Sequence, residues 1–374
     1  MRLCLLVFMF LICPSVFAQS ARQIAASLDD NALAAQVLLT GIDGRKSLAP
    51  AMKSQLERIP AGGIMLFRYN LDSSKEDVKK LLSETASLVT ERTGIPPFMA
   101  VDHEGGLVQR FGAGVERLPP AFYFWELSQS EGMRRAFAWA ETLYRRSAME
   151  IRDLGITMVL GPVAEILNAE NQVFLDTRSY GPDRYFTEEA ASIYVRSMNS
   201  SGIASVVKHF PGNTAADPHD GTSTLRSDKA ALDEMARPFA GIIRGLKPPA
   251  VMLSHVVVPA LDSQRNASLS RRVIEDWLRG ELGFEGIVLA DDFSMGAVTV
   301  TGLDPNAAAV EALNAGVDMM MVWPRNLTSV HSAILSAVKD GRLSRERLVE
   351  AASRIIAEKI RYGLVAPSGV SVSR

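Results

Sequence analysis

The sequence predicts an α/β fold, a single-domain (β/α)8 barrel of the TIM type, and three observations support this class. Eight short apolar runs recur along the 374 residues. Most are rich in Val, Ile, Leu and Met and lack polar alternation, as in strands buried on both faces of a parallel sheet. Helical patterns lie between several runs, which is typical of strand–helix units. No G-x-G-x-x-G loop follows the first run, which disfavours a dinucleotide-binding open sheet.

The order of the elements follows from the same pattern. The eight expected strands are 36–40, 62–67, 98–101, 157–160, 205–207, 250–253, 286–290 and 318–322. The clearest expected helices are 74–90, 135–154, 270–282 (capped by Ser268 or Ser270) and 343–364, which Gly363 ends. We expect this last, charged helix to pack across the barrel wall. No linker, repeat or low-complexity segment divides 19–374, so one domain is predicted.

The first 18 residues have the pattern of a secretory signal peptide. A positively charged start is followed by the apolar stretch 3–17, and small residues precede a cleavage site between Ala18 and Gln19. We therefore expect export to the periplasm or beyond. Lipidation at Cys13 is the weaker option, because Ile12 precedes it where a small residue is needed. No later run approaches about 18 apolar residues, so no membrane span is expected.

Composition excludes several classes of function. Both cysteines, Cys4 and Cys13, lie in the expected signal peptide, so 19–374 can form no disulfide and has no cysteine nucleophile or thiolate ligand. The formal net charge is −2, with both signs interspersed and no basic run. Nucleic-acid binding is therefore not expected.

Polar residues follow four of the apolar runs. They are Asp102-His103-Glu104, Lys208-His209, Ser254-His255 and Asp291-Asp292. In a barrel, the carboxyl ends of all strands open onto the face that carries the chemistry. Any one of these residues could instead cap a helix or belong to a loop, but four strand ends together favour a site. His331 falls in what is expected to be a surface helix.

The residue types in this group favour acid/base chemistry with a carboxylate nucleophile. No G-x-S-x-G elbow occurs, and neither His-x-His nor His-Glu-x-x-His is present. We therefore expect no metal and no cofactor. A metal-dependent amidohydrolase that uses the histidines as ligands remains an alternative.

Four stretches resemble one known family. They are VDHEGGLVQRF at 101–111, KHFPG at 208–212, MLSHVVVPALD at 252–262 and LGFEGIVLADDFSMGAV at 282–298. The chain resembles the family 3 glycoside hydrolases, and within them the single-domain β-N-acetylhexosaminidases that recycle peptidoglycan fragments. The resemblance runs in family order from about residue 36 to 364.

The resemblance implies the catalytic roles. Asp291 corresponds to the nucleophile, which would form a covalent glycosyl-enzyme with net retention. Asp292 is expected to point to the other side of the strand and to cap the following helix. Asp217 and His219 correspond to a dyad in which the imidazole is the general acid and base. The competing interpretation is that Asp217-Pro218 only forms a turn.

The resemblance also implies contacts with the sugar. The expected substrate-binding residues are Asp102, Arg110, Arg178, Lys208 and His209. Asp102 would accept hydrogen bonds from ring hydroxyls, and the other four residues, His209 included, would donate to hydroxyl or acetamido oxygens. Gly105 and Gly106 would allow a tight turn or a close backbone approach. His255 is equally consistent with a structural histidine and with a ligand contact.

The chain departs from the family pattern at three places. Leu107 stands where the family commonly has Arg, and Asn213-Thr214 where it has His-Gly. The stretch between KHFPG and the Asp-x-His pair is also two residues shorter than usual. We expect the loop to deliver His219 differently from the way its relatives do.

The predicted function is that of a monomeric, retaining exo-β-N-acetylglucosaminidase. Its oligosaccharide substrate would be a peptidoglycan fragment or a chitooligosaccharide. The alternatives are another family 3 exo-glycosidase, such as a β-glucosidase, and a catalytically impaired glycan-binding protein.

Overall fold

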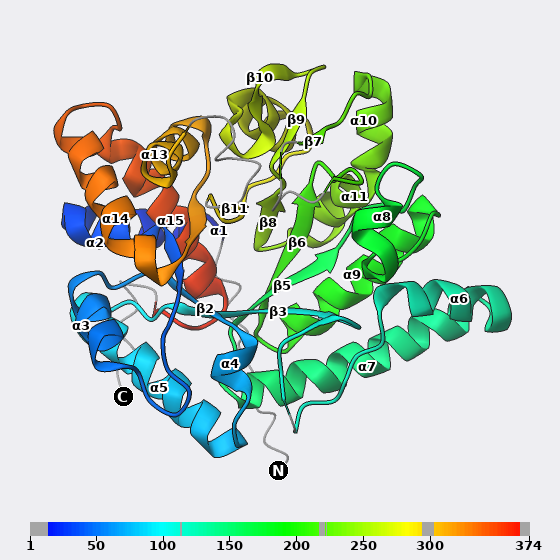
Figure 1. Cartoon of the computed structure of the whole chain (residues 1–374), viewed down its shortest axis with the longest axis horizontal. Helices are drawn as coiled ribbons and strands as arrows, with labels where there is room; N and C mark the ends of the chain where they lie inside the picture. Colours follow the sequence, from blue (N-terminus) through cyan, green and yellow to red (C-terminus); the bar gives the residue numbers. More distant parts are fainter. Residues whose placement is uncertain (1–13, 113, 217–220, 222, 294–302, 367–374) are drawn as a thin grey trace, which may run out of the picture.

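The computed structural model describes residues 14–366 apart from 113, 217–220, 222 and 294–302, and within them eight parallel strands form a closed barrel (Figure 1). The strands are β1 (Leu38–Gly41), β2 (Gly63–Leu66), β3 (Phe98–Gly105), β5 (Met158–Val163), β6 (Ala204–Phe210), β8 (Ala250–Leu253), β11 (Ile287–Ala290) and β12 (Met319–Val322). Each of the eight predicted apolar runs forms one of these strands. β1 pairs with both β2 and β12, which closes the sheet.

Burial explains why these segments are strands. Every residue of β1, β2, β6, β8 and β11 is buried, because side chains point alternately into the barrel and toward the surrounding helices. One short strand, β4 (Val108–Gln109), extends the sheet by returning antiparallel to β3. Three others, β7 (Ser223–Thr224), β9 (Val256–Val258) and β10 (Asp262–Asn266), form a separate small sheet.

Helices surround the barrel in Figure 1. The described α-helices are α1 (Pro14–Ser27), α2 (Asp30–Gln36), α3 (Pro50–Arg58), α4 (Arg68–Leu71), α5 (Lys75–Thr93), α6 (Ala121–Glu131), α7 (Met133–Asp153), α8 (Gln172–Leu175), α9 (Arg184–Ser200), α10 (Lys229–Met235), α11 (Arg237–Leu246), α13 (Pro305–Ala315), α14 (Pro324–Lys339) and α15 (Arg345–Arg361). Two 3₁₀ helices, η1 (Asp176–Arg178) and η2 (Ala267–Leu269), and one π-helix, η3 (Arg272–Glu281), complete the set. The four predicted helices correspond to α5, α7, η3 and α15. Ser74 caps α5 by accepting a hydrogen bond from the Asp77 N–H at 3.1 Å.

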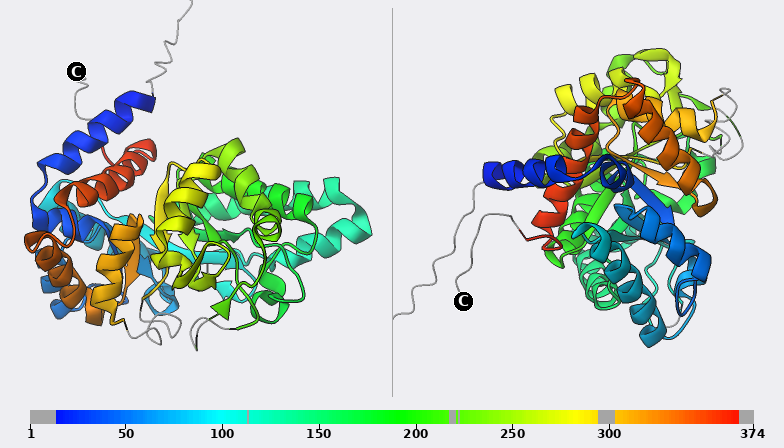
Figure 2. Two further views of the ribbon diagram at one scale, coloured as in Figure 1. Left: turned by 90° about the horizontal axis from the view of Figure 1, so that it is seen from above. Right: turned by 90° about the vertical axis from the view of Figure 1, so that its left-hand side faces the viewer.

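The C-terminal helix α15 packs against the outside of the barrel, as the sequence predicts. It contacts α1, α2, α13 and β11, and Gly363 follows it in a left-handed conformation with φ 71°. Figure 2 shows α1 and α15 side by side. Ala21 and Ala25 of α1 are fully buried.

His331 lies on α14, a helix with one exposed and one buried face. Its side chain is on the buried face, at 3% exposure, and its Nε2 lies 3.0 Å from the carbonyl oxygen of Asn31. Among the described residues, no helix is both long and apolar enough to cross a membrane.

Candidate active site

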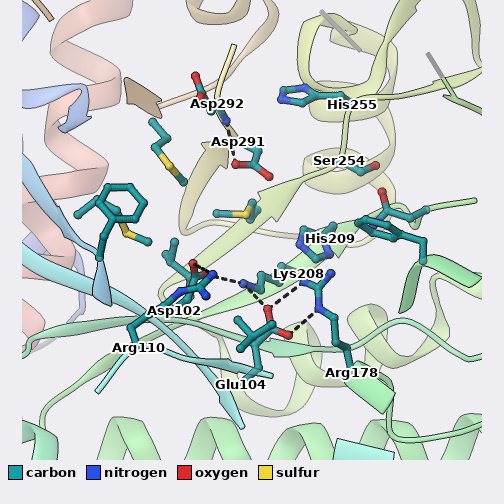
Figure 3. Close-up of a pocket in the computed structure, with 18 of the residues that line it drawn as sticks. Asp102, Glu104, Arg110, Arg178, Lys208, His209, Ser254, His255, Asp291 and Asp292 are labelled. Carbon is teal, nitrogen blue, oxygen red and sulfur yellow. Dashed lines mark hydrogen bonds and ion pairs between the residues drawn. The ribbon is translucent and has the colours of Figure 1, made fainter. Parts of the chain in front are cut away.

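A cavity of about 440 Å³ opens at the carboxyl ends of the barrel strands. Figure 3 shows side chains from several strand ends pointing into it. The polar lining residues are Asp102, Glu104, Arg110, Arg178, Lys208, His209, Asn213, Ser254, His255, Asp291, Asp292 and Arg325. Residues 102–105 and 208–210 still belong to β3 and β6, so the sheet itself fixes these side chains.

An alternating network of charges forms one wall of the cavity (Figure 3). The Lys208 Nζ lies 3.0 Å from Asp102 Oδ1 and 2.7 Å from Glu104 Oε1. The Arg178 guanidinium donates to both oxygens of Glu104, at 2.8 and 2.9 Å. Arg110 donates to Asp102 Oδ2 at 3.2 Å. Bidentate and charge-assisted bonds of this kind fix side-chain positions.

The network keeps its members charged. Burial alone would raise the pKa of Asp102 and Glu104, but the neighbouring cations Lys208, Arg110 and Arg178 outweigh it and hold both values below their ordinary range. Burial likewise opposes the charge of Lys208, whereas the two carboxylates raise its pKa. The wall therefore presents fixed charges at neutral pH.

A glycine turn returns the chain from β3 to Arg110. Gly105 and Gly106 have φ values of 100° and 55°, which side chains other than glycine rarely adopt. A Cβ atom on Gly105 would also lie 2.2 Å from the carbonyl oxygen of Pro119. The expected tight turn and close backbone approach are thus confirmed, and they allow Arg110 to reach Asp102.

Asp291 follows β11 on another side of the cavity. Its Oδ1 accepts a hydrogen bond from the Asp292 N–H at 2.8 Å. Asp292 was expected to point to the opposite side of the strand, and this is wrong. The strand ends at Ala290, so its alternation no longer applies, and Asp292 lines the same cavity and accepts a hydrogen bond from the Trp323 indole N–H. The start of the helix that Asp292 was expected to cap lies outside the described residues.

A buried carboxylate supports His209. Glu165, whose side chain is 2% exposed, lies 2.7 Å from His209 Nδ1. It also accepts from the backbone N–H of Asn213 at 2.7 Å and from the Asn213 side-chain amide at 2.9 Å. No motif marks Glu165, because its partners lie more than 40 residues further along the chain.

The structure brings six of the predicted site residues together. Asp102, Arg110, Arg178, Lys208, His209 and Asp291 all line the cavity. Asp217 and His219 lie outside the described residues, so their placement stays a prediction. Glu165, Phe67 and Trp323 were not selected from the sequence. Glu104 was identified as part of a strand end but received no role, although it lies two residues after Asp102 on the same strand and so on the same face.

The other histidines differ in environment. His103 is fully buried on the opposite face of β3, with its Nε2 2.6 Å from Ser147 Oγ, and does not line the cavity. His255 lines the cavity at 1% exposure, and its Nδ1 lies 2.8 Å from Ser268 Oγ. Burial lowers the pKa of His255, although Asp291 and Asp292 oppose this shift.

A second, open groove of about 580 Å³ continues from the cavity. Its floor is an aromatic stack in which the rings of Phe67 and Trp323 lie 4.9 Å apart and nearly parallel, with Tyr69 beyond Phe67. Arg45 and Arg68 line the groove. No ion pair joins these two arginines to a carboxylate within the part of the chain that the structure describes.

The described residues contain no cluster of three or more His, Cys, Asp or Glu side chains that could hold a metal ion. What they provide is a carboxylate, Asp291, that faces a wall of fixed hydrogen-bond donors and acceptors and forms no ion pair within the described residues. This arrangement suits a polar, neutral ligand rich in hydroxyl groups, with the carboxylate free to act as a nucleophile.

Comparisons with known proteins agree with this geometry. Residues 34–357 match the family described as "Glycosyl hydrolase family 3 N terminal domain". The chain is similar to a β-hexosaminidase of Stenotrophomonas maltophilia (33% identity, 76% of this chain and 83% of that protein) and to one of Methylobacillus flagellatus (35% identity, 70% and 73%). It also superposes on the glycoside hydrolase family 3 β-N-acetylglucosaminidase of a Paenibacillus species, with a TM-score of 0.82 and 31% identity. That alignment covers 93% of this chain but only 65% of the solved one.

Proposed function

Because this chain belongs to glycosyl hydrolase family 3, and is thus a glycoside hydrolase, we propose that it is a retaining exo-β-N-acetylglucosaminidase. It removes terminal N-acetylglucosamine from peptidoglycan fragments or chitooligosaccharides. The observation that carries the proposal is the position of Asp291, which faces the cavity opposite the network of Asp102, Lys208 and Arg110. The names of the relatives support the choice of sugar.

The network orients the sugar. Lys208 and the guanidinium groups donate to hydroxyl and acetamido oxygens, and Asp102 accepts from ring hydroxyls. Asp291 then attacks the anomeric carbon, and its new C–O bond forms as the glycosidic C–O bond breaks. Water hydrolyses the resulting ester in a second displacement, which gives net retention.

The leaving oxygen takes its proton from His219, and Asp217 holds the imidazole in the required tautomer. In the second step the same imidazole accepts a proton from water. Support for these two roles comes from the sequence motif alone. The proposal also includes export after cleavage at Ala18, which the N-terminal pattern supports.

The adjoining groove would receive the leaving group. Its stacked rings of Phe67 and Trp323 offer an apolar face to a sugar. Arg45 and Arg68, together with Arg325 at the cavity rim, favour a leaving group that carries a carboxylate. This supports peptidoglycan fragments over neutral chitooligosaccharides.

Covalent trapping tests the nucleophile. A fluorinated slow substrate should leave an N-acetylglucosamine-derived adduct on the peptide that contains Asp291, and Asp291→Ala should lower kcat by several orders of magnitude because the covalent route is lost. An adduct on Asp292 or Asp102 would place the nucleophile elsewhere. Faster cleavage of a glucoside than of an N-acetylglucosaminide would favour a β-glucosidase.

Substrates with different leaving groups test the general acid. His219→Ala should slow bond cleavage of a disaccharide by about 10²–10⁴-fold, and that of a nitrophenyl glycoside far less, because nitrophenolate departs without a proton. Equal losses on both substrates in the bond-breaking step would remove His219 from this role.

A further inference from the structure

Glu165 is a buried carboxylate that accepts hydrogen bonds from backbone and amide N–H groups and also contacts the imidazole of His209. The backbone N–H of His209 (3.2 Å) and the His209 Nδ1 (2.7 Å) approach Oε1. The backbone N–H of Asn213 approaches Oε2 at 2.7 Å, and its side-chain amide contacts both oxygens at 2.9 and 3.2 Å. The backbone N–H groups and the Asn213 amide already place donors on both oxygens, an arrangement that suits an ionised carboxylate, which can only accept.

The barrel places Glu165 beside His209. Val163 at the end of β5 is in register with Lys208 of β6, and the Ala164 N–H donates to the Lys208 carbonyl at 2.8 Å. The Glu165 carbonyl in turn accepts from Ser179 Oγ at 2.7 Å. The backbone that carries the carboxylate is therefore held from both sides.

This contact determines which ring nitrogen of His209 carries the proton. With Glu165 ionised, Nδ1 must hold a hydrogen and donate it, which leaves Nε2 for the cavity that His209 lines. Within the described residues, the other charged or titratable groups near this pair are Lys208 on the same strand, Arg178 from η1 and His255 after β8. A hydrogen-bonded carboxylate commonly fixes the tautomer of a functional histidine in this way.

We propose that Glu165 is a positioning residue that holds the His209 proton on Nδ1 and directs the lone pair of Nε2 at a hydroxyl group of the bound sugar, from which it accepts a hydrogen bond. Asn213 holds the carboxylate from its other side. Where the family that this chain resembles commonly has His, Asn213 donates to Glu165 through a side-chain amide that does not titrate. This inference rests on the proposed function, since His209 is taken to contact N-acetylglucosamine.

Binding of N-acetylglucosamine, measured by calorimetry without turnover, tests the proposal. Glu165→Gln should raise Kd about 10- to 100-fold, the range seen when the hydrogen-bond partner of a metal-binding histidine is lost. Glu170→Gln is the matched control, because Glu170 is exposed on the same loop, and its Kd should equal that of the wild type. Glu165→Asp, which keeps the charge, should recover part of the affinity.

A double-mutant cycle separates positioning from a general structural effect. In a His209→Asn background, Glu165→Gln should change Kd less than about twofold, because the residue through which Glu165 acts is gone. An equal loss in both backgrounds, or a wild-type Kd for Glu165→Gln, would overturn the proposal.

Asn213→Ala provides a second, milder variant in case Glu165→Gln does not fold. It should weaken binding less than Glu165→Gln does, and its effect should also vanish without His209. An undiminished effect in the His209→Asn background would count against the proposal. Wild-type protein that neither binds N-acetylglucosamine nor cleaves its glycosides would overturn the proposed function as well, whereas an active wild type with an unaffected Glu165→Gln would overturn this inference alone.

Discussion

His103 points toward the surrounding helices and His209 points into the cavity, so the two side chains have opposite surroundings. His209 is paired with the carboxylate of Glu165 and faces the cavity. His103 is fully buried, touches Ser147 and packs against the ring of Phe111 at 5.1 Å. Burial without a charged partner lowers the pKa of His103 to about 4.

This shift predicts a dependence of stability on pH. Between about pH 6.5 and about pH 4 the unfolded chain binds a proton on residue 103 that the folded chain does not. The contribution of neutral His103 to the free energy of unfolding is therefore fully present above about pH 6.5 and is lost as the pH falls to about 4. Urea unfolding should show that the free energy of unfolding of the wild type falls by about 3 kcal/mol more than that of His103→Gln between pH 7 and pH 4. Parallel pH profiles for the two proteins would contradict this.

At the residue scale, the sequence predicted what motifs encode and missed what only folding brings together. Asp102, Lys208 and Asp291 were found because each stands in a motif beside an apolar strand. Glu165 and Trp323 were not found, because their roles depend on contacts with His209, Asn213 and Asp292 that exist only after the barrel closes.

At the scale of elements, Asp318 connects the barrel to its outer helices. The side chain is fully buried immediately before β12. It contacts Arg279 of η3 at 2.6 Å, and Arg347 and Arg354 of α15 at 3.0 and 2.9 Å. It also accepts from the Val288 N–H at 3.0 Å. One carboxylate thus joins two strands and two helical segments.

Removal of this charge should destabilise the fold. Asp318→Asn would leave partly buried arginines without their counter-ion, which typically costs about 3–5 kcal/mol in the free energy of unfolding. The control is Glu346→Gln, which removes an exposed partner of Arg22 and should change stability by less than about 1 kcal/mol. Denaturant unfolding at pH 7 measures both, and similar values for the two variants would contradict the argument.

The strands were predicted in the correct order, but the apolar runs of β1, β3, β5 and β6 end before their strands do at the functional end. β3 continues to Gly105 and β6 to Phe210, beyond the apolar runs that indicated them. An apolar run in the sequence ends at the first charged residue. The backbone hydrogen bonds of the strand continue past that residue where its charged side chain is paired. Lys208 remains in its strand because Asp102 and Glu104 neutralise it.

At the scale of the whole molecule, the number of apolar runs was sufficient to predict a closed barrel, because each strand is buried on both faces. Neither the packing of α1 against α15 nor the groove beside the cavity could be predicted from the sequence. α1 overlaps the segment that was assigned to a signal peptide, and the groove is formed by Arg45, Arg68 and Trp323, which lie far apart in the sequence.

The charge network has a consequence for the response to dissolved salt. Asp102, Glu104, Lys208 and Arg178 are mutually paired and largely buried, and such pairs are screened much less than exposed charges. Raising NaCl from about 0.05 to about 0.5 M should therefore leave KM for a neutral chitooligosaccharide nearly constant. KM for a substrate whose leaving sugar bears a carboxylate should rise over the same range, because Arg45 and Arg68 are exposed to the solvent. Parallel salt curves for the two substrates would contradict this. The enzyme would thus respond to the ionic strength around it through its leaving group and not through the sugar it recognises.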